Sequence, residues 1–153
     1  MKMPARMVSF AASFILLSLF CTVDVQARND AFFLSIQEAI NSVGEAKLRF
    51  SDDVRFYFGD QPPLGVETTL AQVTAYKKGS ITVKTEAEAC NSAFLEALTQ
   101  LQKLARRAGG DAVINIESYY KKRSFKSNSQ YECHAGSAKV GVMLRGDIVR
   151  MKN

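Results

Sequence analysis

The neighbouring residues Cys133 and His134 combine a thiol with an imidazole, the groups of a nucleophilic cysteine site. Adjacent residues of a strand point to opposite faces, and a cysteine held in a disulfide has no thiolate to offer. We therefore expect a disulfide beside an exposed histidine here, rather than a catalytic pair. His134 is the single histidine of the 153 residues, which excludes catalytic schemes that need several. With one histidine and no spaced cluster of carboxylates, we expect neither a metal nor a cofactor.

A basic segment with aromatic neighbours has the composition of a binding loop. Residues 119–130 are polar and include Tyr119, Tyr120 and Phe125. Lys and Arg side chains can contact phosphates while aromatic rings stack or embed. The alternative is a solvated loop whose charges keep the protein soluble. The cations of this candidate anion-binding loop are Lys121, Lys122, Arg123 and Lys126.

Residues 1–27 have the layout of a secretory signal peptide. Two basic residues precede an apolar run over residues 8–20, and the small residues Val25 and Ala27 fit a cleavage site. We expect cleavage after Ala27 and export to the periplasm or out of the cell.

Two alternatives to cleavage involve the membrane. A membrane anchor is disfavoured because the apolar run falls short of the roughly 20 residues that a spanning helix needs. Membrane contact is therefore expected only through the uncleaved signal. Lipidation of Cys21 is disfavoured because Phe20 stands where a lipoprotein signal has a small residue.

Removal of the signal changes the cysteine count. It takes away Cys21 and leaves Cys90 and Cys133, and it lowers the formal net charge from +5 to about +4. In an oxidising compartment, the two remaining cysteines most economically bond to each other. Loop-closure entropy assigns such a bond roughly 3 to 4 kcal/mol of stabilisation. The moderate positive charge allows an anionic partner without requiring one.

Helical periodicity marks two segments. Over residues 30–48, apolar side chains recur every three or four positions, which predicts an amphipathic helix. The second helix, residues 86–108, has a continuous apolar stripe, a capping box at Thr85 and Glu88, and a Gly-Gly stop after it. Because this Gly-Gly pair ends a helix and begins a strand, it is not a dinucleotide-binding loop.

Alternating side chains predict four strands. The polar residues 77–80 are expected to end the second strand. Because a strand, a helix, a tight turn and a strand follow one another, we expect a right-handed crossover that joins parallel neighbours, followed by an antiparallel strand. The predicted strands cover residues 53–58, 69–76, 111–117 and 138–145, with a prolongation of the last to residue 151.

The predicted fold class is α+β, with a small four-stranded sheet and one long covering helix. A length near 150 residues predicts a single core. Residues 1–27 form the signal peptide, residues 28–50 an N-terminal amphipathic helix, and residues 51–153 a single disulfide-stapled domain.

Several motifs resemble a group of small exported bacterial proteins of unestablished function. Members of the group often carry a transferred label that names them as excinuclease ABC, a DNA-repair ATPase. This chain has neither the Gly-x-x-x-x-Gly-Lys-Ser/Thr loop nor the Cys-x-x-Cys zinc sites of such an enzyme. The motifs that carry the resemblance are residues 54–61, Cys90-x-x-Ala93-Phe94, and residues 108–116, 118–120, 131–133 and 135–138.

A more distant resemblance covers residues 85–145. This part is similar to the YbjQ-like proteins and to the core of RcsF, an outer-membrane lipoprotein that senses envelope stress. The chain lacks the second cysteine pair, the long Pro-rich tether and the lipidation signal of RcsF. The resemblance therefore implies the fold more than the role.

The expected function is that of an exported, non-enzymatic envelope or secreted protein that binds or senses an anionic envelope component, such as lipopolysaccharide. Nucleic acid is not expected as a partner outside the cytoplasm. Two alternatives stay open. One is a small exported hydrolase or thiol enzyme whose site is built in an oligomer, and the other is a structural homo-oligomer of the kind that YbjQ-like proteins form through their sheets.

Overall fold

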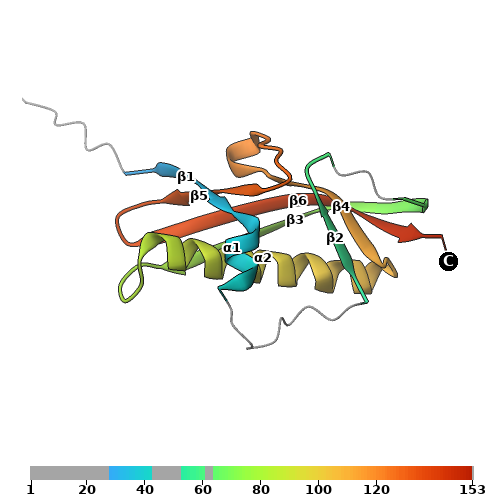
Figure 1. The fold of residues 1–153 in the computed structure, drawn as a ribbon, viewed down its shortest axis with the longest axis horizontal. Helices are drawn as coiled ribbons and strands as arrows, with labels where there is room; N and C mark the ends of the chain where they lie inside the picture. The colour runs from blue at the N-terminus through green and yellow to red at the C-terminus, as the bar shows by residue number, and fades with distance from the viewer. Residues whose placement is uncertain (1–27, 43–52, 61–63, 153) are drawn as a thin grey trace, which may run out of the picture.

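The computed structural model describes residues 28–42, 53–60 and 64–152 and has an α+β fold (Figure 1). The expected signal peptide and its cleavage site after Ala27 lie outside the described residues. No helix within the described ranges is long and apolar enough to cross a membrane. The elements in chain order are β1 (Asp30–Ser35), α1 (Ile36–Asn41), β2 (Arg55–Phe58), β3 (Val66–Ser80), α2 (Glu86–Ala108), β4 (Ala112–Ser118), the 3-10 helix η1 (Tyr120–Lys122), β5 (Gln130–Ala135) and β6 (Lys139–Met151).

Strand β6 is the centre of a curled six-stranded sheet. β3 pairs antiparallel with it along its whole length, from Ser80 opposite Lys139 to Val66 opposite Met151. On the other side of β6, β5 pairs with the first part of the strand and β4 with the second part. β1 then extends the sheet beyond β5, and β2 pairs in parallel with β4. Every other strand is thus joined to β6 directly or through one neighbour.

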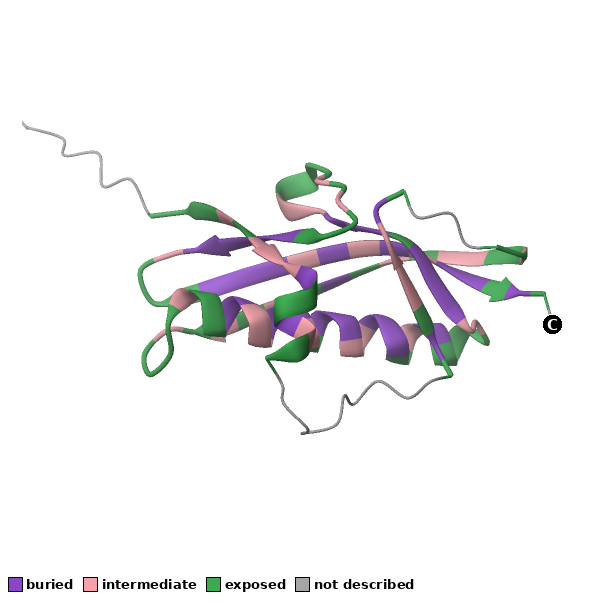
Figure 2. Cartoon of the chain, viewed as in Figure 1, coloured by how far each residue is buried: buried purple, intermediate pink, exposed green. Residues whose placement is uncertain are grey.

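Helix α2 packs its apolar stripe against one face of this sheet, as predicted, and Figure 2 shows buried residues, in purple, along both the helix and the strands. Full burial of a Leu, Ile or Phe side chain contributes about 1.5 to 3 kcal/mol, so this interface is the main source of stability. The buried residues of α2 are Ala89, Cys90, Ala93, Phe94, Ala97, Leu98, Leu101, Gln102 and Ala105. The inward residues of β6 are Val140, Val142, Leu144 and Ile148.

Both ends of α2 are capped as the sequence predicts. The Thr85 hydroxyl accepts a hydrogen bond from the backbone N–H of Glu88, whose carboxylate accepts one from the backbone N–H of Thr85 at 2.8 Å. The backbone N–H and the hydroxyl of Thr85 both donate to the Glu88 carboxylate, and these two hydrogen bonds lower its pKa. At the other end, Gly109 has a left-handed backbone with φ of +73°.

The predicted disulfide joins Cys90, near the start of α2, to Cys133 of β5. Both residues are fully buried, and their Cα atoms are 6.0 Å apart. Cys133 lies inside β5, the strand that precedes the last strand β6. The bond ties the covering helix to the sheet, as expected.

The predicted N-terminal helix is wrong over its first part. Residues Asp30–Ser35 form β1, which pairs antiparallel with β5, and the helix α1 begins only at Ile36. The consecutive apolar residues of this segment fit a strand as well as a helix, so pairing with β5 decides the outcome. The Ser35 hydroxyl accepts a hydrogen bond from the backbone N–H of Glu38, and this Ser-x-x-Glu spacing is the sequence signal for the true helix start. Residues 43–48 of the prediction lie outside the described residues.

The sheet differs from the prediction in three further respects. It has six strands instead of four, because β1 and β5 have no counterpart among the predicted strands. β5 is buried on both faces and therefore lacks the alternation by which strands are found. Residues 77–80 continue β3 instead of ending it. The predicted crossover runs from β3 through α2 to β4, but it does not join neighbouring strands, because β6 lies between β3 and β4 and pairs antiparallel with both. The parallel pair of neighbours in the sheet is β2 with β4.

Gly79 of β3 allows α2 to approach the sheet closely, which leads to a stability prediction. A Cβ atom at this position would lie 2.8 Å from the backbone oxygen of Ala89 and 3.0 Å from Cγ2 of Val140. Because the first of these atoms belongs to helix backbone, we expect Gly79→Ala to destabilise the protein by about 1 to 3 kcal/mol in chemical denaturation. The control is Gly136→Ala, whose Cβ would meet nothing closer than 3.5 Å. Equal denaturation midpoints for the two variants would contradict close packing at Gly79.

Candidate functional site: a basic loop and a polar hollow

The candidate site lies on the face of the sheet opposite to α2, which is called the outer face below. Figure 1 shows η1 and its flanking loop on this side of the sheet, away from the long helix. The loop over residues 119–129 leaves β4 and returns into β5. It brings its side chains over the outer faces of β4, β5 and β6.

The loop is held by backbone hydrogen bonds at its base. Ser118 and Phe125 exchange two such bonds, with N to O distances of 3.0 and 2.8 Å. The backbone N–H of Tyr119 donates to the carbonyl of Met143 in β6 at 2.9 Å. The basic residues are thus presented by a fixed turn.

A stacked ring pair fixes the loop from above. The Tyr120 ring lies flat on the His134 imidazole, with ring centroids 3.6 Å apart. The Nε2 atom of His134 is 2.8 Å from the carboxylate of Glu132. His134 is only 5% exposed, so the expectation of an exposed histidine is wrong. The loop covers His134, and no local sequence pattern predicts the contact between Tyr120 and His134.

The thiol pair considered from the sequence does not exist in this structure. His134 faces the outer face beneath Tyr120, whereas Cys133 is bonded to Cys90 of α2 on the other face. The alternation of side chains along β5 separates the two groups, as predicted from the sequence.

Three of the four predicted cations stand together at the loop tip. Lys121, Lys122 and Arg123 are exposed and, among the described residues, none of them forms an ion pair with a carboxylate. Lys121 and Lys122 have φ values of +48° and +64°, the left-handed region that non-glycine residues seldom adopt. Such conformations persist only where the surrounding structure imposes them. We call these three residues the basic tip.

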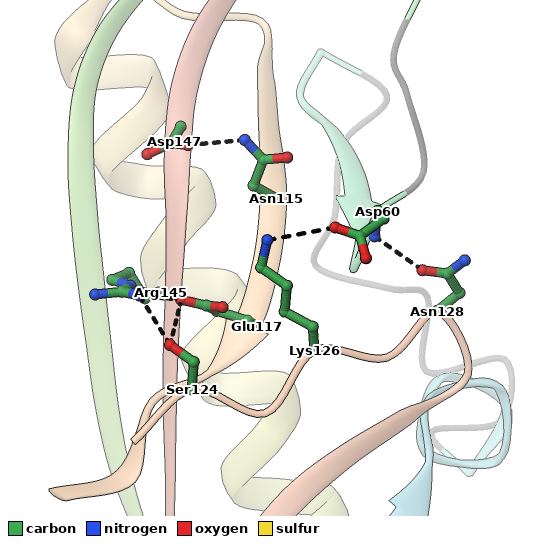
Figure 3. Close-up of polar contacts among 8 residues, drawn as sticks. All are labelled: Asp60, Asn115, Glu117, Ser124, Lys126, Asn128, Arg145 and Asp147. Atoms are coloured by element: carbon green, nitrogen blue, oxygen red, sulfur yellow. Dashed lines mark hydrogen bonds and ion pairs between the residues drawn. The ribbon is translucent and has the colours of Figure 1, made fainter. Parts of the chain in front are cut away.

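Lys126, the fourth predicted cation, lies elsewhere. Its Nζ atom is 3.3 Å from a carboxylate oxygen of Asp60, which follows β2 (Figure 3). The neighbouring Phe125 contacts Phe33 of β1, with ring centroids 4.7 Å apart. Phe33 is 49% exposed and adds an aromatic surface beside the loop. This surface could not be predicted, because the sequence pattern predicts a helix for the segment that contains Phe33.

A polar hollow of about 240 Å³ opens on the outer face next to Lys126. No function of this polar hollow is predicted from the sequence. The one signal for the polar hollow in the sequence is Asn115, a polar residue within the otherwise apolar run of β4. The lining of the polar hollow includes Gln72, Asn115, Glu117, Lys126, Arg145 and Asp147, most of which Figure 3 shows.

Glu117 and Arg145 form the ion pair at one side of this polar hollow. The Glu117 side chain is only 4% exposed, and its Oε1 atom accepts hydrogen bonds from Arg145 Nε at 2.7 Å and from the Ser124 hydroxyl at 3.2 Å. The guanidinium also lies 3.6 Å above the Tyr119 ring. Burial is the largest single effect and lowers the pKa of Arg145, but the hydrogen bond with Glu117, the charge of Glu117 and the neighbouring Tyr119 together raise it by more, so the net shift is upward. The Arg145 guanidinium therefore stays charged.

A bulge in β4 shapes the other side of the polar hollow. The pairing of β4 with β6 shifts by one residue between Ile114 and Glu117, and Asn115 has a left-handed φ of +53°. This conformation directs the Asn115 amide to Asp147, with Nδ2 2.9 Å from Oδ2. Asn tolerates the left-handed region better than most residues, which explains its presence here.

No protein-family model, curated protein or solved structure matches this chain. The resemblance to the small exported proteins, to the YbjQ-like proteins and to the RcsF core stays a prediction. Within the described ranges, no group of three or more His, Cys, Asp and Glu side chains is placed to hold a metal ion.

The Glu117–Arg145 ion pair leads to a prediction about stability. Replacing Arg145 by Gln leaves a buried carboxylate without its cation, and removing one partner of such a pair is strongly destabilising. We expect Arg145→Gln to lower the free energy of unfolding by at least about 2 kcal/mol, measured by chemical denaturation. The double variant Glu117→Gln/Arg145→Gln should recover part of this loss, because it also removes the unpaired charge.

The matched control is Arg107→Gln, an exposed arginine on α2. It should change stability by no more than about 0.5 kcal/mol. A result in which Arg145→Gln behaves like this control would show that the Glu117–Arg145 pair contributes nothing.

Proposed function

We propose that the protein is an exported, non-enzymatic module that binds an anionic component of the cell envelope through the basic tip. The observation that carries the proposal is the fixed display of Lys121, Lys122 and Arg123 without a carboxylate partner in the described part of the chain. Lipopolysaccharide phosphates are the favoured target. Nucleic acid is not proposed, because it is not expected where the protein acts.

The disulfide supports a location outside the cytoplasm. Bonds such as Cys90–Cys133 form and persist in oxidising compartments and are rare where thiols are kept reduced. The proposed location is the periplasm or the exterior of the cell, reached after removal of residues 1–27.

The geometry of the loop suits binding to a negatively charged surface. Each Lys or Arg near an anionic membrane contributes about 1 kcal/mol, so the basic tip supplies about 3 kcal/mol. The turn is already ordered by the Tyr120–His134 stack, so little entropy is lost when it binds. The exposed ring of Phe33 adds an apolar contact beside the charges.

A structural homo-oligomer is the second candidate, and the edge of β3 favours it. The 15-residue strand β3 pairs with β6 on one side, and no strand among the described residues pairs with its other side. Lys77 and Lys78 lie on this edge, however, and charged residues of this kind discourage edge pairing. Sedimentation at increasing protein concentration tests the candidate, and a constant monomer mass would reject it. The remaining alternative is a small exported hydrolase or thiol enzyme whose site is built in an oligomer. A thiol enzyme needs a free thiolate, which a disulfide does not provide.

The first test concerns export. When the full chain is expressed, we expect the exported protein to have the mass of residues 28–153 less two hydrogen atoms, because the signal is cleaved and the cysteines are bonded. A thiol reagent should label Cys90 and Cys133 only after reduction. A mass that retains residues 1–27, or a cysteine that reacts before reduction, would contradict the proposal.

The second test concerns the basic tip. The variant Lys121→Ser/Lys122→Ser/Arg123→Ser should bind vesicles that contain lipopolysaccharide about a hundredfold more weakly than the parent at low salt, because it lacks about 3 kcal/mol of electrostatic attraction. Binding is measured by cosedimentation, and the parent's own binding should weaken as salt is added.

The control variant has the same net charge as the basic-tip variant but keeps the three residues of the basic tip. It is Lys103→Ser/Arg107→Ser/Lys139→Ser, which removes three exposed cations of α2 and β6. It should retain most of the binding. Equal losses in the two variants would show that net charge alone attracts the vesicles and would reject the basic tip as the site.

A further inference from the structure

We propose that the free edge of β3 receives an extended acidic peptide of a partner protein as an added strand, and that the groove between β3 and α2 binds the acidic side chains of this peptide. The groove lies on the side of the sheet that α2 covers, whereas the basic tip lies on the outer face. The proposal goes beyond the proposed function and stands on the backbone of β3 and on the charges beside it.

The free edge of β3 provides the first argument. The strand has 15 residues, and its pairing with β6 is regular from Ala71 to Ser80. An edge strand presents a row of unpaired backbone N–H and C=O groups on its other side. No strand in the described part of the chain pairs with these groups. An extended peptide can bind such an edge through main-chain hydrogen bonds.

A groove beside this edge provides the second argument. Helix α2 runs along β3, because Gly79 lies close to the backbone of Ala89 while Leu70 lies close to Gly110, just beyond the helix. A groove of about 380 Å³ opens between Lys77 of β3 and the neighbouring flank of α2. Side chains alternate between the two faces of a strand, so every second side chain of a strand added to β3 would point towards α2 and this groove. The lining of the groove includes Lys77, Glu96, Gln100, Lys103, Leu104 and Arg107.

The charge of the groove provides the third argument and selects an acidic peptide. Three cations line the groove against the single carboxylate of Glu96, and none of these cations forms an ion pair within the described ranges. Lys103 and Arg107 are one helical turn apart, a spacing at which like charges destabilise a helix. Lys77 adds a third positive charge from β3. Carboxylates of a bound peptide would offset this repulsion.

The same charges disfavour a second copy of the chain as the occupant of this edge. A second β3 strand would bring its own Lys77 and Lys78 and therefore more positive charge. Lysines on an edge strand oppose pairing with strands of the same kind. An acidic strand meets no such repulsion, so these lysines discriminate between partners by charge.

The test compares three labelled peptides of about eight residues, a common strand length. One alternates Glu with Thr, the second alternates Lys with Thr, and the third is the acidic peptide with two Thr residues replaced by Pro. Binding to the whole protein is measured by fluorescence anisotropy at low salt. We expect the Glu-Thr peptide to bind and the Lys-Thr peptide not to bind. The Pro-containing peptide should bind at least about tenfold more weakly at the same charge, because Pro cannot donate to a strand ladder.

A matched pair of variants locates the bound peptide. Lys77→Ser/Lys103→Ser/Arg107→Ser should bind the Glu-Thr peptide about tenfold more weakly, because it lacks the three cations of the groove. The basic-tip variant Lys121→Ser/Lys122→Ser/Arg123→Ser has the same net charge and should bind this peptide like the parent. The second variant separates the proposal from the vesicle test. Hydrogen exchange of β3 amides in the parent should slow when the Glu-Thr peptide is added.

Four results would overturn the proposal. Equal binding of the Pro-containing peptide would show that no strand is added, and equal losses in the two variants would show that net charge alone attracts the peptide. The absence of any binding of the Glu-Thr peptide would reject the site. A parent that sediments as a dimer, with β3 amides protected before any peptide is added, would show that a second copy occupies the edge.

Discussion

The backbone of β6 must find hydrogen-bond partners on both sides over thirteen residues, and the rest of the molecule is arranged around that requirement. β3 satisfies one side alone, while β5 and β4 divide the other. Where β4 pairs with β6, Gly146 leaves room for Val113 and Ile116 to point into the core from either side of the bulge. The left-handed turn at Asn115, and with it the polar hollow, exists because β4 carries one residue more than β6 at this place.

The two faces of the sheet differ in composition and in what covers them. The inner face is apolar and is covered by α2, and the disulfide fixes the helix to β5. The outer face holds charged and aromatic side chains that pair with one another beneath a short loop. Ser124 and Lys126 of that loop lie at the polar hollow, while Lys121 to Arg123 of the same loop form the basic tip. One loop thus borders the polar hollow and carries the basic tip.

The parts of the fold that sequence reasoning finds are those that depend on local pattern. The apolar stripe of α2, its Thr85–Glu88 capping box and its glycine stop lie within one continuous segment, and all of them are present. β1 and β5 depend on each other across about a hundred residues, and neither shows alternation strong enough to reveal it alone. The same reason applies to the candidate site. The basic loop can be predicted from the sequence, because its lysines and arginine are consecutive. The polar hollow cannot, because it forms only when β3, β4 and β6 pair in register. The burial of His134 likewise depends on Tyr120, which folds back over it.

The order of the described strands along the chain has a consequence for assembly. The central strand β6 follows β3, β4 and β5 in the sequence, so these strands are synthesised before the partner with which they pair. Until residues 139–151 arrive, the sheet has no centre on which to close. A chain built in this order stays open during its synthesis, which is the state in which a polypeptide can still be threaded across a membrane. Moving the central strand to the front of the sequence would let the core close early and remove that interval.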